Sequence, residues 1–410
     1  MTASRPESAE QSPVPLTRPR NGTPEVVATA AALEAACDAL AAGSGPVAVD
    51  TERASGYRYW QRAYLVQLHR AGAGTILIDP IAFDGELDRL TEVLAGVEWV
   101  LHAADQDLPC LRELNLTPPR LFDTELAARL AGYERVALGT MTELLLGYQL
   151  EKGYSAADWS RRPLPSEWLN YAALDVELLL PLRNQLATVL DAQQKLDWAH
   201  QEFAAIRDAP PTPQRPEPWR RTSGIHKVKT TRGLAAVRAL WQARDTLAYD
   251  HDTAPGRILP DKAIIAAALA DPHTSAELHE LSTFRGRARR RHSGLWLRQL
   301  QSARRVPASE LPELTTPTDG PPPTNRWADL APDAAARLAA AKEAVATVAT
   351  QHTLPVENLL QPSLLRQLCW SPPADAGITG TAAALRAGGA RAWQVDLVAE
   401  PVSRALAPVD

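Results

Sequence analysis

The chain has 410 residues, of which 45% are hydrophobic and 22% are charged. This composition excludes a fully disordered or collagen-like chain, and the length predicts two to four domains. The net charge of −5 argues by itself against a nucleic-acid-binding protein, but the charge is unevenly distributed. Residues 1–210 sum to −11, residues 211–310 to +9 and residues 311–410 to −3. A strongly basic segment therefore lies between two acidic ones.

The cysteines and the hydropathy pattern favour a cytoplasmic protein. Cys37, Cys110 and Cys369 are odd in number and widely spaced, so they fit neither a disulfide framework nor a zinc site. No run of 18 apolar residues occurs, which excludes a membrane-spanning helix. The first residues lack the charged-then-apolar order of a signal peptide.

The N-terminal half predicts a disordered leader followed by an α/β domain. Residues 1–25 have no apolar periodicity, which favours disorder, and a folded domain is expected over residues 26–207. Three short apolar runs joined by tight connections predict an antiparallel meander of strands, and alternating helices and strands then predict a mixed sheet. The expected strands are residues 46–49, 64–68, 75–78 and 99–102; the expected helices are 28–42 and 86–95, with others beginning near Leu108, Glu125, Thr140 and Ser166.

The C-terminal half predicts two small all-α domains separated by proline-rich linkers. We expect linkers at residues 208–224 and 309–324, because both are rich in proline. The segments between and after them, residues 225–308 and 325–405, both show a helix, a loop with proline and another helix. Since the two patterns recur about 100 residues apart, they predict a degenerate internal duplication.

Two carboxylates stand at the end of the first predicted strand. Asp50 and Glu52 occur in the sequence VAVDTE, and residues i and i+2 of a strand face the same side. Two like charges held close together are costly unless a cation neutralises them. An acidic strand end is common, however, so this pair alone does not identify a site.

Two further segments supply polar side chains. His102 closes a strand and is followed by Asp105 and Asp107, either of which could simply cap the next helix. Tyr171 and Asp175 are four residues apart in a predicted helix, which places them on one face. Four carboxylates from three elements, with a phenol beside them, suit two divalent cations about 4 Å apart. Oxygen ligands without Cys/His clusters favour Mg²⁺ or Mn²⁺ over zinc.

These segments resemble a known family. DTE at 50–52, HAADQDL at 102–108 and YAALD at 171–175 resemble the three motifs of the DEDD superfamily of 3′–5′ exonucleases, in its tyrosine subclass. LFDTELAARLAG at 121–132 and DWSRRPLPSEWLNYAALDVELLLPL at 158–182 are similar to the ribonuclease D family in particular. The basic segment resembles an HRDC domain and the last segment a second, diverged one. The resemblance implies a ribonuclease H-like exonuclease domain followed by two HRDC-type domains.

The resemblance also implies roles for individual residues. Asp50, Glu52, Asp107 and Asp175 match the metal-binding carboxylates, and Tyr171 matches the tyrosine that orients the attacking water. Asp107 is preferred to Asp105 because the family aspartate directly precedes a leucine, although the proline that follows this leucine here departs from the pattern. The implied reaction is hydrolysis of RNA from its 3′ end by two divalent cations, with Asp50 expected to bridge them. Precursors of transfer RNA are the implied substrates.

The basic segment predicts a nucleic-acid-binding surface. Arginines cluster there with hardly any acidic residue between them, whereas solvated helix faces usually alternate in sign. Trp296 either stacks on a base or belongs to the core. The predicted contacts are Arg285, Arg287, Arg289, Arg290, Arg291, Arg298 and Trp296. The same motifs also suit a DNA 3′–5′ exonuclease, and a non-catalytic nucleic-acid-binding protein remains a third interpretation; a monomer is expected.

Overall fold

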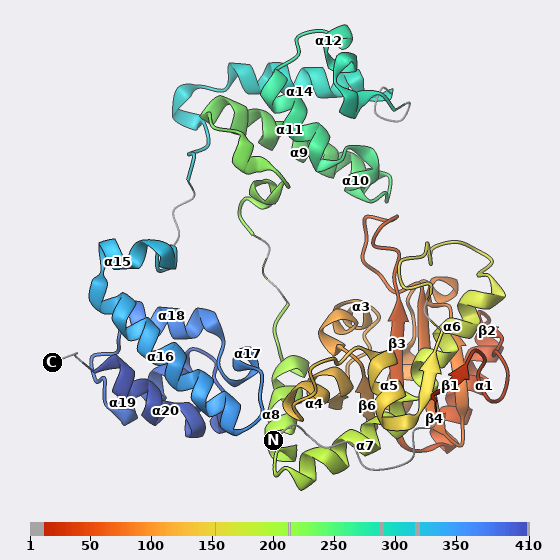
Figure 1. The fold of residues 1–410 in the computed structure, drawn as a ribbon. Coiled ribbons are helices and arrows are strands. Elements are labelled where there is room, and N and C mark those ends of the chain that lie inside the picture. Colours follow the sequence, from red (N-terminus) through yellow and green to blue (C-terminus); the bar gives the residue numbers. More distant parts are fainter. Residues whose placement is uncertain are drawn as a thin grey trace.

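A computed structural model describes residues 12–151, 153–211, 213, 215–286, 291–315 and 320–407. These residues form a mixed α/β domain followed by two helical domains (Figure 1). This arrangement confirms the predicted fold class. Within the described residues no helix is both long and apolar enough to cross a membrane.

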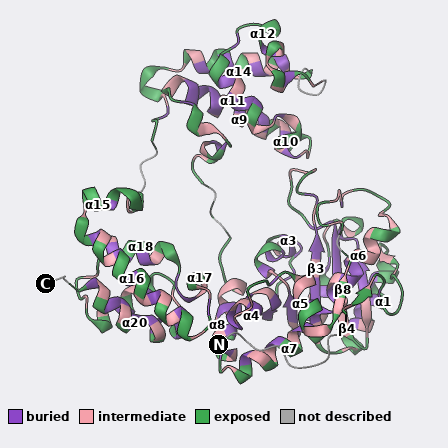
Figure 2. Ribbon diagram, in the orientation of Figure 1, coloured by how far each residue is buried: buried purple, intermediate pink, exposed green. Residues whose placement is uncertain are grey.

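A six-stranded mixed sheet forms the centre of the first domain, in the order β2-β5-β4-β3-β6-β7. The predicted meander is confirmed, since β3, β4 and β5 pair antiparallel, while β3, β6 and β7 are parallel. The strands are mostly buried (Figure 2). Their bounds are β2 Val26–Val27, β3 Ser44–Glu52, β4 Leu65–Ala71, β5 Gly74–Ile78, β6 Glu98–Leu101 and β7 Arg120–Asp123.

Helices cover the sheet and carry part of the candidate site. One helix, α6, packs on β3, β4 and β5, whereas α7 packs on β3 and β6. The helices are α1 Ala30–Ala42, α2 Asp88–Leu94, α3 Leu108–Glu113, α4 Thr124–Leu130, α5 Leu138–Leu146, α6 Ser166–Glu177, α7 Leu179–Ala192 and α8 Leu196–Arg207, with 3₁₀ turns at Pro80–Phe83 and Ala104–Gln106.

The predicted disordered leader is wrong for residues 12–25. Strand β1 (Val14–Leu16) pairs in parallel with β8 (Tyr148–Leu150), more than a hundred residues away in the chain. The backbone N–H of Arg20 donates to the carboxylate of Glu177 on α6 at 3.2 Å, and the Asn170 amide donates to the carbonyl of Thr17. This order comes from distant partners, so no local periodicity announces it. Residues 1–11 lie outside the described part.

The middle domain has its own core, which includes Trp219, Ile264 and Phe284. Trp219 is 3% exposed in this core, so the predicted linker 208–224 extends too far: its last residues belong to the domain. The helices are α9 Thr231–Asp250, α10 Pro255–Ile258, α11 Asp261–Ala270, α12 Ser275–Glu280 and α14 Ser293–Arg305, with 3₁₀ turns at Pro218–Arg221, Ile225–Lys227, Ser282–Phe284 and Ala308–Glu310.

The C-terminal domain repeats the order of the middle one. In both, a 20-residue helix, a one-turn helix and a further helix begin at equal offsets, at residues 231, 255 and 261 and again at 332, 356 and 362. This regular offset supports the predicted duplication. The helices are α15 Trp327–Leu330, α16 Pro332–Gln351, α17 Val356–Leu359, α18 Pro362–Trp370, α19 Ile378–Ala387 and α20 Ala392–Leu406, after a 3₁₀ turn at Thr324–Arg326.

The C-terminal domain packs on α8 of the first domain. The rings of Trp198 and Trp393 stack with centroids 5.0 Å apart. The buried carboxylate of Glu202 accepts from Nη2 of Arg391 at 2.8 Å and from Nε1 of Trp393 at 3.0 Å. Both domains share one cluster of buried apolar residues, so the interface continues the core of the first domain.

The middle domain contacts the first domain at the loop between β3 and β4. Arg257 donates through Nε to the carbonyl of Gly56 at 2.7 Å and lies over the ring of Tyr57 at 3.9 Å. The backbone N–H of Tyr59 donates to the carboxylate of Asp252 at 3.1 Å. The loop that follows Glu52 is therefore braced by the middle domain.

Candidate active site

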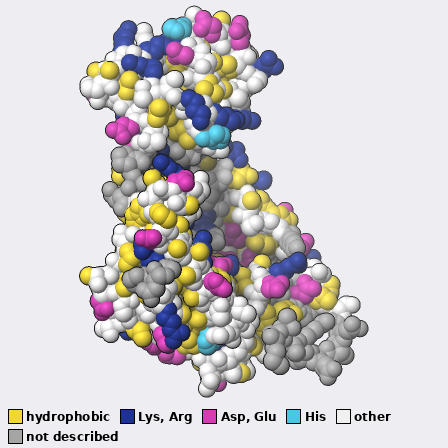
Figure 3. All heavy atoms as spheres, turned by 60° about the vertical axis from the view of Figure 1, so that its left-hand side comes forward, with side chains coloured by type: hydrophobic (Ala, Val, Ile, Leu, Met, Phe, Trp, Pro, Cys, Tyr) yellow, Lys and Arg dark blue, Asp and Glu magenta, His cyan; other side chains and the backbone are white. Residues whose placement is uncertain are grey.

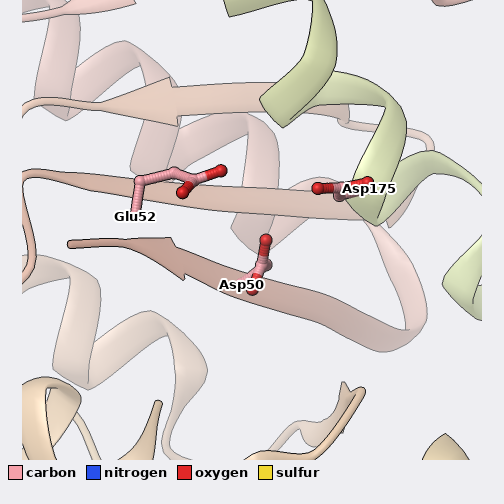
Figure 4. Close-up of side chains that lie close together, drawn as sticks. All are labelled: Asp50, Glu52 and Asp175. Atoms are coloured by element: carbon pink, nitrogen blue, oxygen red, sulfur yellow. The ribbon is translucent and has the colours of Figure 1, made fainter. Parts of the chain in front are cut away.

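Three carboxylates from two elements converge at the end of β3. Asp50 and Glu52 lie on the same face of the strand, and α6 packs on that face and contributes Asp175 (Figure 4). One ligand oxygen from each lies within 4.8 Å of the others, so the three can hold a single metal ion. The predicted convergence of these three residues agrees with this geometry.

The fourth predicted carboxylate lines the same cavity but has other partners. Asp107, at the start of α3, is 4% exposed, and its Oδ1 accepts from the hydroxyl of Thr51 at 2.6 Å. The guanidinium of Arg53 lies 3.5 Å from the same oxygen and donates to the carbonyl of Gln106. In this arrangement Asp107 is held beside the cluster of three and is not part of it.

The cavity around these side chains has a volume of about 870 Å³. The carboxylates Asp50, Glu52, Asp107 and Asp175 all line it, as does Tyr171. A cavity of this size can admit the end of a polymer chain, and these four carboxylates make part of its wall acidic.

Burial and mutual repulsion raise the pKa values of the site carboxyls. Desolvation raises the pKa of Asp50 and Glu52 well above the ordinary range, and the neighbouring carboxylates add to the effect. Burial also raises the pKa of Asp175 to about 7, although a hydrogen bond from Tyr171 acts in the opposite direction. Among the described residues no Lys or Arg forms an ion pair with these three carboxylates. A divalent cation would supply the missing positive charge, so the donor set fits Mg²⁺ or Mn²⁺.

Tyr171 is one helical turn before Asp175 on α6 and donates a hydrogen bond to its carboxylate. Burial and the nearby negative charges raise the pKa of the phenol above its ordinary value. The hydroxyl therefore stays protonated at neutral pH. It can orient a water molecule by hydrogen bonding, but it cannot act as a base.

The neighbouring motif residues differ in their surroundings. His102 lines the cavity, and its Nδ1 lies 2.9 Å from the hydroxyl of Thr124. Burial lowers the pKa of His102 to about 4, so its ring is neutral at physiological pH. Asp105 is exposed and is not among the residues that line the cavity, which supports the preference for Asp107.

Arg162 anchors the segment that leads into α6. Its guanidinium makes two hydrogen bonds to the carboxylate of Asp79, at 2.6 and 2.7 Å. It also donates to the carbonyls of Tyr64 and Trp159, each at 2.8 Å. This arginine was not predicted as a functional residue, because Asp79 and Tyr64 lie 83 and 98 residues away from it in the chain.

The predicted nucleic-acid contacts divide into three groups. Arg285, Arg291 and Arg298 are exposed on the middle domain, where basic side chains gather on the surface (upper part of Figure 3). Trp296 is fully buried in the core of that domain, so the prediction that it stacks on a base is wrong. It belongs instead to the buried apolar core, to which α9 and α14 both contribute. The other predicted contacts, Arg287, Arg289 and Arg290, lie outside the residues that the structure describes.

Family models match three parts of the chain. A 3′-5′ exonuclease model matches residues 24–191, an HRDC model residues 233–300, and a model described as 3′ to 5′ exonuclease C-terminal domain residues 320–406. A ribonuclease D of Acidiphilium cryptum is 33% identical over 349 residues, which are 80% of this chain and 87% of that protein. The chain belongs to the ribonuclease D family. The predicted resemblance is confirmed, and with it the prediction of a hydrolytic exonuclease domain.

Two solved structures share nearly the whole fold. A protein from Bifidobacterium adolescentis is 38% identical with a TM-score of 0.89, covering 96% of this chain and 99% of that one. Escherichia coli RNase D, described as an exoribonuclease involved in structured RNA processing, is 25% identical with a TM-score of 0.67 over 93% and 98% of the two chains. This chain spans a smaller share of two other ribonuclease D proteins: 61% of the length of the one from Sphingobium indicum and 58% of the length of the one from Bartonella henselae.

Proposed function

We propose that this ribonuclease D family member is a metal-dependent exoribonuclease that shortens RNA from its 3′ end with two divalent cations. The observation that carries the proposal is the convergence of Asp50, Glu52 and Asp175, unpaired by any cation from the described chain, with the phenol of Tyr171 in one cavity. Ionising all three carboxylates in the buried site is costly, and bound positive charge lowers that cost.

The site residues would divide the chemistry between binding and orientation. Asp50, Glu52 and Asp175 would hold the cations, and Asp107 would join them by leaving its contact with Arg53. Bound divalent cations would supply an activated water and offset charge on the leaving 3′ oxygen. Tyr171, protonated and hydrogen-bonded to Asp175, would hold that water in line with the terminal phosphate.

RNA is the proposed substrate because the likeness to E. coli RNase D covers 93% of this chain and because the middle domain is basic. Arg285, Arg291 and Arg298 would contact the phosphate backbone and bring the 3′ end to the acidic cavity. Precursors of transfer RNA are the proposed cellular targets, and a cytoplasmic monomer is the proposed form.

A direct test uses 5′-labelled RNA with a 3′ extension and a single-stranded DNA of the same sequence. Each is incubated with the full chain and Mg²⁺ or Mn²⁺, beside D50A and the exposed-site control D105N. Stepwise shortening of RNA by the wild type and D105N, but not by D50A, is the expected result. Faster shortening of the DNA would instead favour a DNA exonuclease, and no shortening of either polymer with both metals would refute the proposal.

A further inference from the structure

A buried amide without a partner lies on the strand next to the metal-binding cluster. Gln67 is fully buried on β4, and neither its Oε1 nor its Nε2 has a hydrogen-bond partner in the structure. Its neighbours along the strand, Leu65, Val66 and Leu68, are buried and apolar. Burying a primary amide without partners is unfavourable, so an apolar side chain would suit this position better for folding alone.

The register of the sheet places Gln67 directly opposite Asp50. These two residues are paired across β4 and β3, so their side chains point to the same face with Cβ atoms about 4.5–5.5 Å apart. A contact two residues further along, on the same face, supports this orientation: His69 and Thr75, paired across β4 and β5, lie with Nδ1 and Oγ1 at 2.8 Å. The same face is covered by α6, which carries Asp175.

Few other groups on the neighbouring strands could form a hydrogen bond with the Gln67 amide. The residue opposite Gln67 on β5 is Leu77, which is apolar. The nearest residues on its own strand are Leu65, also apolar, and His69, whose ring nitrogen is already bound to Thr75. Asp50 is therefore the polar residue directly opposite the amide on the neighbouring strands, and Glu52 lies diagonal to it.

We propose that Gln67 is a positioning residue for the metal site: its amide N–H group donates to the Asp50 carboxylate oxygen that faces away from the cations. The inference rests on the proposed function. Hydrogen bonds to metal-bound carboxylates fix their orientation, and their loss commonly lowers metal affinity or activity. A neutral amide suits this position, because it donates hydrogen bonds without adding another negative charge to a site already crowded with carboxylates.

The test replaces the amide by an apolar group of similar length. In Q67M, Mn²⁺ affinity measured on the full chain by calorimetry or electron paramagnetic resonance is expected to fall about 10- to 100-fold. The exposed-strand control Q149M should bind Mn²⁺ as the wild type does. Thermal unfolding of Q67M in EDTA is expected at or above the wild-type temperature, because an unpaired buried amide has been removed. At saturating Mn²⁺ the KM for RNA should stay unchanged while kcat falls.

Two further measurements test whether Gln67 acts through Asp50. If Gln67 acts through Asp50, the losses of Mn²⁺ affinity in Q67M and D50N will not add in the double variant. Q67L serves as a second variant if Q67M does not fold. Unchanged Mn²⁺ affinity in a folded variant would overturn this inference and leave the proposed function standing. Absence of Mn²⁺ binding by the wild type would overturn both.

Discussion

Replacing Asp175 by asparagine should stabilise the metal-free protein while it abolishes activity. Burial raises the pKa of this carboxyl from the ordinary 3.8 to about 7. At pH 8 it is ionised in both the folded and the unfolded chain, and the folded chain bears the cost of that charge. A shift of about 3 pH units corresponds to about 4 kcal/mol, which is the upper bound for the gain in D175N.

The sign of the effect sets its pH dependence. A carboxyl whose pKa is raised by folding binds more protons in the folded state, so stability falls as the pH rises from about 4 to about 7. D175N lacks this group, so its advantage in EDTA should be largest at pH 8 and should shrink towards pH 5. Divalent cations should stabilise the wild type and not the variant.

Urea unfolding followed by tryptophan fluorescence in EDTA at pH 5 and pH 8 measures both effects, with D105N as the exposed control. If the urea midpoint of D175N at pH 8 is at or below that of the wild type, the ionised Asp175 does not destabilise the folded protein and the prediction is wrong. An equal gain for D175N and D105N would point to overall charge instead of the cluster.

Three other predictions follow from the site and the domain contacts. Y171F should lower kcat by at least about tenfold and leave Mn²⁺ affinity unchanged, because the role proposed for the phenol is to orient water and not to bind the metal; calorimetry beside steady-state kinetics separates the two. R162K should lower the free energy of unfolding by about 1–3 kcal/mol, because a lysine cannot replace the paired contacts with Asp79; an unchanged urea midpoint would contradict this. E202A should lower the free energy of unfolding by about 2–4 kcal/mol, because Arg391 loses its buried partner. The C-terminal domain should then be cleaved faster in limited proteolysis, and cleavage at the wild-type rate would contradict this role of Glu202.

Local patterns in the sequence predicted much of the first domain. The meander of β3, β4 and β5 was predictable because each strand is a short apolar run, but the expected tight connections hold only between β4 and β5, since residues 53–64 form a loop between β3 and β4. Strands β1 and β8 were not, since three-residue strands that pair across the chain leave no periodic signal. The same limit explains why residues 12–25 were expected to be disordered.

For the site, spacing and motifs predicted the identity of the carboxylates but not their contacts. Asp107 was predicted as an equal member of the cluster, whereas Thr51 and Arg53 hold it. These partners immediately follow Asp50 and Glu52, so they could have been considered from the sequence. For Trp296 the core alternative was the right one: it shares a helical face with Leu300 and Ala303, and that spacing indicates burial although the flanking residues are basic.

The loop that follows Glu52, which the middle domain braces, affects how the chain can be divided into separate domains. One end of the loop lines the acidic cavity, and the other end presents Tyr57 and Tyr59 to the HRDC domain. Cutting the chain at the proline-rich linker would therefore uncover aromatic rings and remove hydrogen bonds from a wall of the cavity. The loop belongs both to the cavity wall and to the contact between the two domains, so an isolated first domain would lack part of the support of that wall and would not be simply a shorter enzyme.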